Sequence, residues 1–127
     1  MQGTWQGILM SKSLDNDNKD GLQTTLTIVD DNNSGNYTGE MIIYYKYQTD
    51  YYKARYKVVG KVDYSNYTLT LTQTEFIYGD LLPKGLQWCI GGGNFRIFRS
   101  SSTKKYYMDG TYETNFNEKY RMVLFKK

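Results

Sequence analysis

The sequence contains no histidine, and it has one cysteine, one proline and one alanine among its 127 residues. Without histidine, the chain cannot build a Ser-His-Asp or Cys-His nucleophile, a histidine-ligated zinc site or a histidine-ligated haem. A single cysteine cannot form an internal disulfide, an iron–sulfur cluster or a cysteine-rich zinc site. We therefore expect no metal centre and no cofactor.

Long apolar runs and a strong charge excess are also absent. No apolar run approaches the roughly 20 residues that a membrane-spanning helix needs, so we predict no membrane span. Sixteen basic and thirteen acidic residues leave a net charge of +3, which is far less than a nucleic-acid-binding tail carries. The densest basic stretch, from Lys53 to Lys61, has the odd spacing of one solvated strand face. We expect no nucleic-acid partner.

The residues that are abundant favour β-strands. Val, Ile and Thr together number 25, and the aromatic residues number 21; both groups favour strands, whereas alanine, the best helix former, occurs once. Alternating apolar and polar residues, separated by clusters of Gly, Asn and Asp, recur about eight times, and no stretch has the helical period. The predicted strands cover residues 3–10, 22–30, 36–48, 51–63, 66–78, 86–98, 104–114 and 119–126.

The connections between these strands are short, and the one proline, Pro83, falls in a loop. Sequential antiparallel strands with hairpin-sized loops form a meander, and a meander of this length removes its edges by closing on itself. We predict an all-β fold, a single up-and-down antiparallel barrel of about eight strands. One domain would span residues 1–127.

Alternation assigns side chains to the barrel interior. On the fourth strand, Ala54, Tyr56 and Val58 alternate with lysine and arginine, so they face inward. On the fifth strand the alternate set consists of threonines, which leaves the apolar set for the interior. The inward residues predicted on the fifth, sixth and eighth strands are Leu69, Leu71, Gln73, Glu75 and Ile77; Leu86, Trp88, Ile90, Gly92, Asn94, Arg96 and Phe98; and Tyr120, Met122 and Leu124.

An eight-stranded barrel either fills with side chains or holds one small ligand. In the second case Tyr56, Trp88 and Met122 would line an apolar cavity. The polar contacts would come from Gln73, Glu75, Asn94 and Arg96. A buried charge is costly unless it is paired, so a Glu75–Arg96 pair would serve as a polar anchor. The alternative is a β-bulge near the run of glycines at 91–93, which would shift the register and place both residues in solvent.

Three further features have alternative readings. Residues 15–21 and 30–35 alternate Asp and Asn as a calcium loop does, but they lack the glutamate at position 12 and also suit strand turns. Cys89 has no base near it in sequence, which is typical of a half-buried structural thiol. The crowded tyrosines either pack the barrel or form a surface for a protein or glycan. They are Tyr37, Tyr44, Tyr45, Tyr47, Tyr51, Tyr52, Tyr56, Tyr64 and Tyr67.

The sequence Gly3-Thr4-Trp5 on the first expected strand resembles the lipocalins and the wider calycin group. In lipocalins this Trp packs under an Arg from the end of the last strand and closes the barrel. The resemblance therefore implies an eight-stranded barrel with barrel-closing roles for Trp5 and Arg121.

A closer likeness, over nearly the whole chain, is to small lipocalin-like domains exported by Bacteroidetes bacteria. The matching segments are residues 3–7, 37–39, 69–75, 88–89 and 110–112. The second cysteine that many of those domains carry is absent here. The likeness implies a fold and a source, and it brings no established activity.

Together these observations predict non-catalytic binding of a small, partly apolar or amphipathic ligand inside the barrel. The alternative is an extracellular interaction module with a filled barrel, which would bind a protein or glycan through its tyrosine-rich surface or loops. An enzyme is the third option, because Glu75 and a second carboxylate could act as acid and base. Glycoside hydrolysis needs two such carboxylates, however, and the sequence places one in the interior. No leader precedes the first strand, so we expect an exported domain whose signal peptide is removed, with a cytoplasmic location as the alternative.

Overall fold

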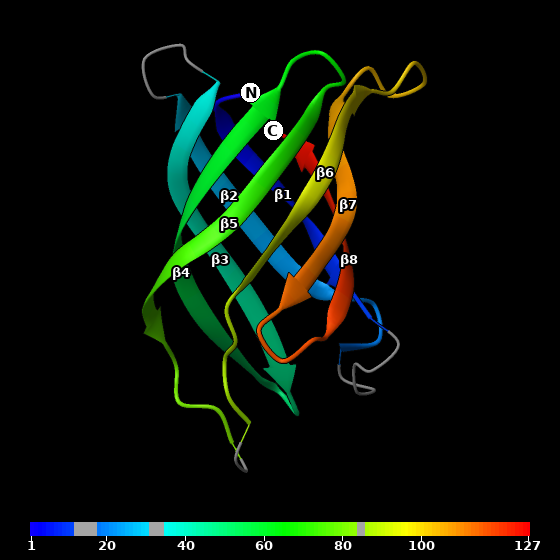
Figure 1. Cartoon of the computed structure of the whole chain (residues 1–127). Helices are drawn as coiled ribbons and strands as arrows, with labels where there is room; N and C mark the ends of the chain where they lie inside the picture. The colour runs from blue at the N-terminus through cyan, green and yellow to red at the C-terminus, as the bar shows by residue number, and fades with distance from the viewer. Residues whose placement is uncertain (12–17, 31–34, 84–85) are drawn as a thin grey trace.

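The computed structural model describes residues 1–11, 18–30, 35–83 and 86–127. Eight antiparallel strands close into a barrel in which each strand pairs with the next and β8 pairs with β1 (Figure 1). The strands are β1 (Gly3–Met10), β2 (Leu22–Asp30), β3 (Asn36–Tyr47), β4 (Asp50–Asp63), β5 (Thr68–Gly79), β6 (Gly91–Arg99), β7 (Tyr106–Thr114) and β8 (Lys119–Lys126). The predicted all-β, up-and-down antiparallel barrel is confirmed. Among the described residues, no helix is long and apolar enough to cross a membrane.

Strict alternation along β4 shows how the sequence directs side chains into the barrel. Ala54, Tyr56 and Val58 are buried, and the residues between them are exposed. This assignment was predicted correctly. The same rule on the other strands gives one continuous apolar core inside the barrel, because side chains alternate between the two faces of a strand.

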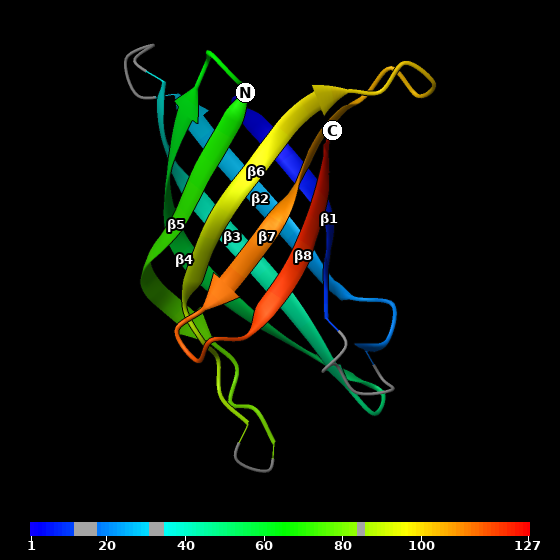
Figure 2. The same ribbon diagram turned by 45° about the vertical axis from the view of Figure 1, so that its right-hand side comes forward.

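One end of the barrel is filled, and we call it the packed end. Both termini lie at this end (Figures 1 and 2). Trp5 is 1% exposed, and its indole nitrogen donates a hydrogen bond of 3.0 Å to the backbone carbonyl of Met1. The other buried side chains here are Ile28, Tyr37, Val62, Leu69, Phe95, Met108 and Leu124. These side chains belong to one buried apolar core.

The opposite end is built differently, and we call it the open end. β5 pairs with β6 only over Thr68–Thr72, and from Gln73 onward it pairs with β4 alone. The connection between β5 and β6 (residues 80–83 and 86–90, here called the strap) leaves the barrel at this end and returns to it (Figure 2). The strap therefore takes the place of a strand in this part of the wall.

Two glycines mark sites where neighbouring strands approach closely. A Cβ atom added to Gly7 would lie 1.9 Å from the carbonyl oxygen of Val123, and one added to Gly39 would lie 1.9 Å from that of Thr27. Both positions face the interior. Glycine in a strand often marks such a bend or close approach.

The predicted inward orientation of Glu75 is wrong. Lys57 pairs with Glu75, whereas the next residue, Val58, pairs with Gln73, so Thr74 is an extra residue in β5. This bulge shifts the alternation by one position after Gln73. Glu75 is consequently exposed on the outer face, where its Oε2 lies 3.1 Å from the Lys57 Nζ.

The predicted phase of β6 is also wrong, and the strand begins later than expected, at Gly91. Phe95 is buried, whereas Asn94 and Arg96 are exposed on the outer face. The apolar residues at 86, 88 and 90 belong to the strap, so their phase does not continue into the strand. Glu75 and Arg96 are both exposed, as the alternative predicted, but the bulge lies at Thr74 in β5 and not near the glycines at 91–93, where the pairings of β6 have no register shift.

Trp5 and Arg121 do not close the barrel together. Trp5 points inward at the packed end and lies opposite Lys126, whereas Arg121 lies opposite Met10 near the other end of β1. Arg121 is exposed and forms a bidentate ion pair with Asp109 on the outer face, with nitrogen–oxygen distances of 2.8 and 3.1 Å. The contact implied by the lipocalin resemblance is absent between these two residues.

Candidate functional site

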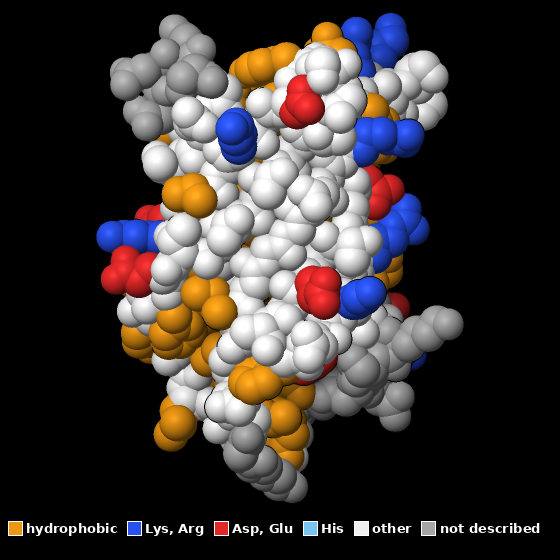
Figure 3. All heavy atoms as spheres, in the orientation of Figure 1, with side chains coloured by type: hydrophobic (Ala, Val, Ile, Leu, Met, Phe, Trp, Pro, Cys, Tyr) orange, Lys and Arg blue, Asp and Glu red, His pale blue; other side chains and the backbone are white. Residues whose placement is uncertain are grey.

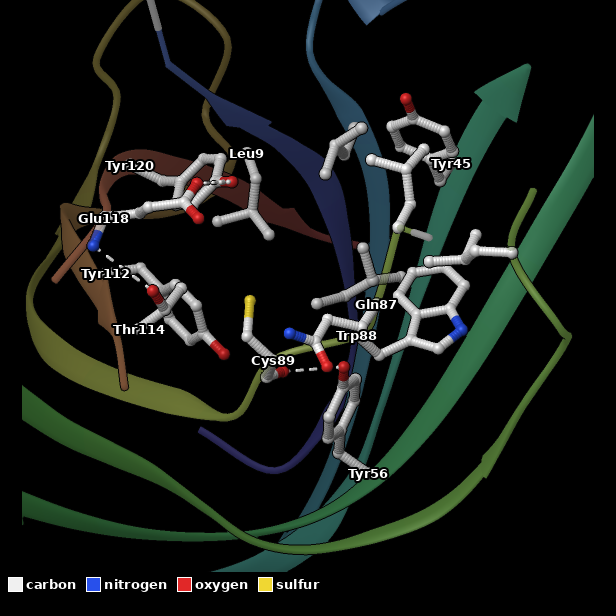
Figure 4. A pocket seen from close by; sticks show the side chains of 14 residues that line it. Leu9, Tyr45, Tyr56, Gln87, Trp88, Cys89, Tyr112, Thr114, Glu118 and Tyr120 are labelled. Atoms are coloured by element: carbon white, nitrogen blue, oxygen red, sulfur yellow. Dashed lines mark hydrogen bonds between the residues drawn. The ribbon is translucent and has the colours of Figure 1, made fainter. Parts of the chain in front are cut away.

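A cavity of about 390 Å³ lies at the open end of the barrel (Figure 4). Its walls come from the inner faces of six strands, from the strap and from the β7–β8 turn. The lining residues are Leu9, Leu22, Ile43, Tyr45, Tyr56, Leu82, Leu86, Gln87, Trp88, Cys89, Tyr112, Thr114, Glu118 and Tyr120. Apolar and aromatic side chains dominate this list, as is typical of small-molecule sites.

Hydrogen bonds from inward polar side chains, and one within the strap, hold the strap over the cavity. The Tyr56 hydroxyl donates a hydrogen bond of 2.8 Å to the carbonyl of Cys89, and the Gly91 backbone N–H donates one of 2.9 Å to the Gln73 Oε1. The Trp88 indole N–H donates one of 2.9 Å to the carbonyl of Asp80. Inward side chains thus satisfy strap groups that no strand ladder would satisfy.

Asp80 anchors the first residue of the strap to β4. Its Oδ2 accepts a hydrogen bond from the Lys53 N–H, its own N–H donates to the Lys53 carbonyl, and both bonds measure 2.9 Å. Its Oδ1 accepts a hydrogen bond of 2.7 Å from the Tyr78 hydroxyl. This hydrogen bond is the largest of the causes that lower the pKa of the Asp80 carboxyl. The strap therefore starts from a position fixed by three hydrogen bonds.

The β7–β8 turn forms the opposite rim. The Thr114 Oγ1 accepts hydrogen bonds of 3.3 Å from the N–H groups of Phe116 and Glu118. Asn115 binds the strap at Ile90, because its N–H donates to the Ile90 carbonyl at 2.8 Å. These contacts connect the turn to the strap, so the two halves of the rim are joined.

Burial favours the neutral forms of four ionisable groups in the lining, three tyrosines and one cysteine. Burial, as the largest cause, raises the pKa values of Tyr56, Tyr112 and Tyr120 above the usual tyrosine range. Burial and the nearby Glu118 carboxylate raise the pKa of the Cys89 thiol, because both disfavour a thiolate. At neutral pH the wall thus presents hydroxyl and thiol groups.

The structure brings some of the predicted site residues to the cavity. Tyr56 and Trp88 line it, and Gln73 faces inward and is 4% exposed. The Gln73 amide, however, is engaged by the Gly91 N–H and donates to the Met41 Sδ at 3.3 Å, so it supports the strap. Met122 is buried in the core and is not part of the cavity wall. Glu75, Asn94 and Arg96, discussed above, point away from the cavity.

Other lining residues were missed in the sequence, although some carried a signal. Alternation along residues 104–114 places Tyr112 on the same face as Met108, which is the inner face. Alternation along their own strands also directs Leu9 and Ile43 inward. Of the strap residues, Leu86 and Trp88 were predicted to face inward, whereas Leu82, Gln87, Cys89 and, in the turn, Glu118 had no comparable signal. Their position depends on how a loop folds back over the barrel end, which a period-2 pattern does not describe.

Apolar side chains are exposed around the open end. Figure 3 shows them gathered in the lower part of the molecule, below a mostly polar middle. Phe76, Ile77 and Tyr78 lie on β5 just before the strap, and Leu81 and Leu86 belong to the strap; Leu81 is 94% exposed. The mouth of the cavity is therefore surrounded by exposed apolar side chains, and exposed apolar patches often mark binding sites.

The two segments with a calcium-like pattern lie partly outside the described residues, at 15–17 and 31–34. In the described part, Asn18 is 4% exposed, and its amide forms hydrogen bonds of 2.7 and 2.9 Å with the backbone of Lys46. Its role is to join the end of the β1–β2 connection to β3. Among the described residues, no group of three or more acidic or thiol ligands could hold a metal ion.

Comparison of the chain with family models, with curated proteins and with solved structures finds no match. The evidence for function therefore comes from the site itself.

Proposed function

We propose that this protein binds a small, partly apolar ligand in the cavity at its open end, without catalysis, as a lipocalin-like barrel. The observation that carries this proposal is the cavity of about 390 Å³ with its aromatic and aliphatic lining. Its volume falls within the range of about 300–1,000 Å³ that is usual for ligand sites. Hydrogen bonds between the strap and inward side chains preform the site, which reduces the ordering that binding requires.

Binding is favoured over catalysis because the described lining contains a single carboxylate, that of Glu118. Glycoside hydrolysis ordinarily needs two carboxyl groups on either side of the substrate. Glu75, the residue we had considered as an acid or base, is on the outer surface in an ion pair with Lys57.

The test is titration with N-phenyl-1-naphthylamine, an apolar probe whose fluorescence rises in a dry site. The Cys89→Phe variant places a ring in the cavity, because the Cys89 thiol points into it (Figure 4). Thr72→Phe is the matched control, since Thr72 is exposed on the outer face of β5. We expect binding by the wild type and by Thr72→Phe, and a loss of about tenfold or more in Cys89→Phe. Equal binding by all three proteins would place the probe elsewhere and contradict the proposal.

The alternative function, an exported interaction module, rests on the exposed tyrosines. Tyr51, Tyr64 and Tyr67 are each more than half exposed, whereas Tyr37 and Tyr56 are buried. A barrel that is filled only at one end supports the ligand binder more than this alternative. Failure of every apolar probe to bind the cavity would reverse that order.

We also propose that the domain is exported, on the basis of its resemblance to exported lipocalin-like domains. The test is expression behind a bacterial signal peptide, followed by recovery of folded protein from the periplasm. Aggregation there, with folded protein in the cytoplasm, would favour a cytoplasmic location.

A further inference from the structure

One hydroxyl in the cavity wall has no hydrogen-bond partner. Tyr112 is 2% exposed, and its Oη atom is buried and unpaired. Two other cavity tyrosines differ in this respect, since Tyr56 donates to the Cys89 carbonyl and Tyr120 donates to the Glu118 Oε2 at 2.9 Å. A buried donor without an acceptor costs free energy, so such groups are rare and usually meet a water or a ligand.

The neighbouring Gln73 does not meet this need. Its Oε1 already accepts the Gly91 N–H, and its Nε2 donates to the Met41 Sδ. Burial, as the largest cause, raises the pKa of Tyr112, and the side chain of Gln73 lowers it, which is the effect of a donor and not of an acceptor. The phenol proton of Tyr112 is therefore left without an acceptor. Figure 4 shows this hydroxyl turned toward Cys89, on the inner side of the wall.

The charges of the lining give a second, independent constraint. The described lining residues include no lysine or arginine, and their single charged group is the Glu118 carboxylate at the rim. Arg96, the cation that we had expected inside, is on the outer face. Among the described lining residues, an anionic ligand would find no cation to offset its lost hydration, and it would meet the like charge of Glu118.

We infer that the cavity selects a neutral molecule with an apolar or aromatic body and a hydrogen-bond acceptor such as a carbonyl, which receives the Tyr112 hydroxyl, and that it rejects carboxylates. This inference rests on the proposed ligand-binding function and names the class of ligand. It distinguishes the site from one built for fatty acids, in which a buried cation would be expected.

The test uses three probes of the same shape: 2-acetylnaphthalene, 2-ethylnaphthalene and 2-naphthoate. Their affinities are measured by calorimetry for the wild type, for Tyr112→Phe and for Tyr120→Phe. Because the ethyl group is more apolar than the acetyl group, the informative quantity is the change in the ratio of the two affinities between proteins. We expect Tyr112→Phe to weaken the acetyl compound about fivefold and to leave the ethyl compound within about twofold.

Tyr120→Phe is the matched control, because it removes a hydroxyl from the same cavity that already has a partner. It should change the acetyl-to-ethyl ratio by less than about twofold. Tyr112→Phe should also unfold at the same or higher urea concentration than the wild type, since it removes an unpaired group. If Tyr112→Phe weakens both compounds equally, or neither, the role assigned to its hydroxyl is overturned.

Rejection of carboxylates has its own variant, which does not depend on whether Tyr112→Phe folds. In the wild type, 2-naphthoate should bind at least about tenfold more weakly than 2-acetylnaphthalene. Glu118→Gln should raise the ratio of the 2-naphthoate affinity to the 2-acetylnaphthalene affinity about two- to fivefold. Tight binding of 2-naphthoate by the wild type would overturn the inference while supporting the proposed function. Failure of all three probes to bind would overturn both.

Discussion

The two ends of this barrel are formed by the same eight strands, but their interiors differ. At the packed end, inward residues of neighbouring strands meet each other, and Trp5 fills the space beneath Met1. At the open end, β5 separates from β6, and the strap with Trp88 replaces the missing pairing. The difference shows that a single closed barrel can be filled with side chains at one end and keep a cavity at the other.

The two tryptophans illustrate this division. Trp5 is almost completely buried and lies on a strand with neighbours on both sides, whereas Trp88 is half-buried and lies on a loop. Residues that bind ligands are often found on loops that a rigid scaffold positions. The comparison predicts that substitutions at the packed end change stability more, and that substitutions at the open end change the cavity more.

The largest difference is expected between truncations of the two tryptophans. Trp5→Ala should lower the free energy of unfolding by about 3–5 kcal/mol, because it leaves a large cavity in a closed core. Trp88→Ala should cost about 1–2 kcal/mol, because a half-buried side chain loses less burial. Urea denaturation followed by circular dichroism measures both. Equal losses would mean that the two ends contribute alike.

Two glycines provide the next comparison. In Gly39→Ala the new Cβ would meet the backbone of β2 at 1.9 Å, and backbone cannot move aside easily. In Gly79→Ala it would meet the side chains of Phe76 and Trp88, at 2.4 and 2.6 Å, which can rotate. We expect a loss of about 2–3 kcal/mol for Gly39→Ala and less than about 1 kcal/mol for Gly79→Ala. Thermal denaturation ranks them, and the reverse order would contradict this description of the open end.

A smaller effect is expected when a hydroxyl that holds the strap is removed. Tyr56→Phe loses the bond to the Cys89 carbonyl, whereas Tyr37→Phe loses a bond of 3.3 Å to the Tyr64 hydroxyl at the packed end. Tyr56→Phe should cost about 1 kcal/mol and speed the reaction of Cys89 with a thiol reagent about threefold or more, because the strap opens more often. Tyr37→Phe should leave that rate unchanged. An unchanged rate in both variants would show that Tyr56 does not control access to the cavity.

The smallest effect concerns the outer ion pair of Arg121. Its guanidinium, through hydrogen bonds, holds the pKa of the Asp109 carboxyl below the ordinary value of 3.8. A lowered folded-state pKa contributes stability above the unfolded value and loses it as the pH falls through the folded value. Arg121→Gln should therefore be slightly less stable than the wild type at neutral pH, and the two should converge below pH 3.8.

The same variant tests whether Arg121 affects the packed end. If Arg121 had the barrel-closing role implied by the lipocalin resemblance, Arg121→Gln would alter the fluorescence of Trp5. We expect the emission of Trp5, measured in a Trp88→Phe background, to be unchanged. A red shift of that emission would restore a link between the two residues.

The success of the sequence analysis varied between strands for a physical reason. From Ala54 to Val62 on β4 the inward residues are apolar or glycine, and the outward residues are lysine or arginine with the exception of Val59, so one phase was favoured, and it was confirmed. On β5 the threonines fixed the phase only up to Gln73, because the bulge at Thr74 reversed it. A bulge adds one residue without any required change in composition, and so Glu75 was placed on the wrong face.

β-Propensity, alternation and short polar connections by themselves determined that this chain forms a closed antiparallel barrel of eight strands. These properties are local, and each is repeated along the chain. The tertiary structure alone decided where β5 parts from β6, which end stays open, and that Tyr112 and Glu118 share a cavity with the strap. Those features depend on contacts between residues far apart in sequence, such as Tyr56 with Cys89 and Gln73 with Gly91, which a local pattern does not encode.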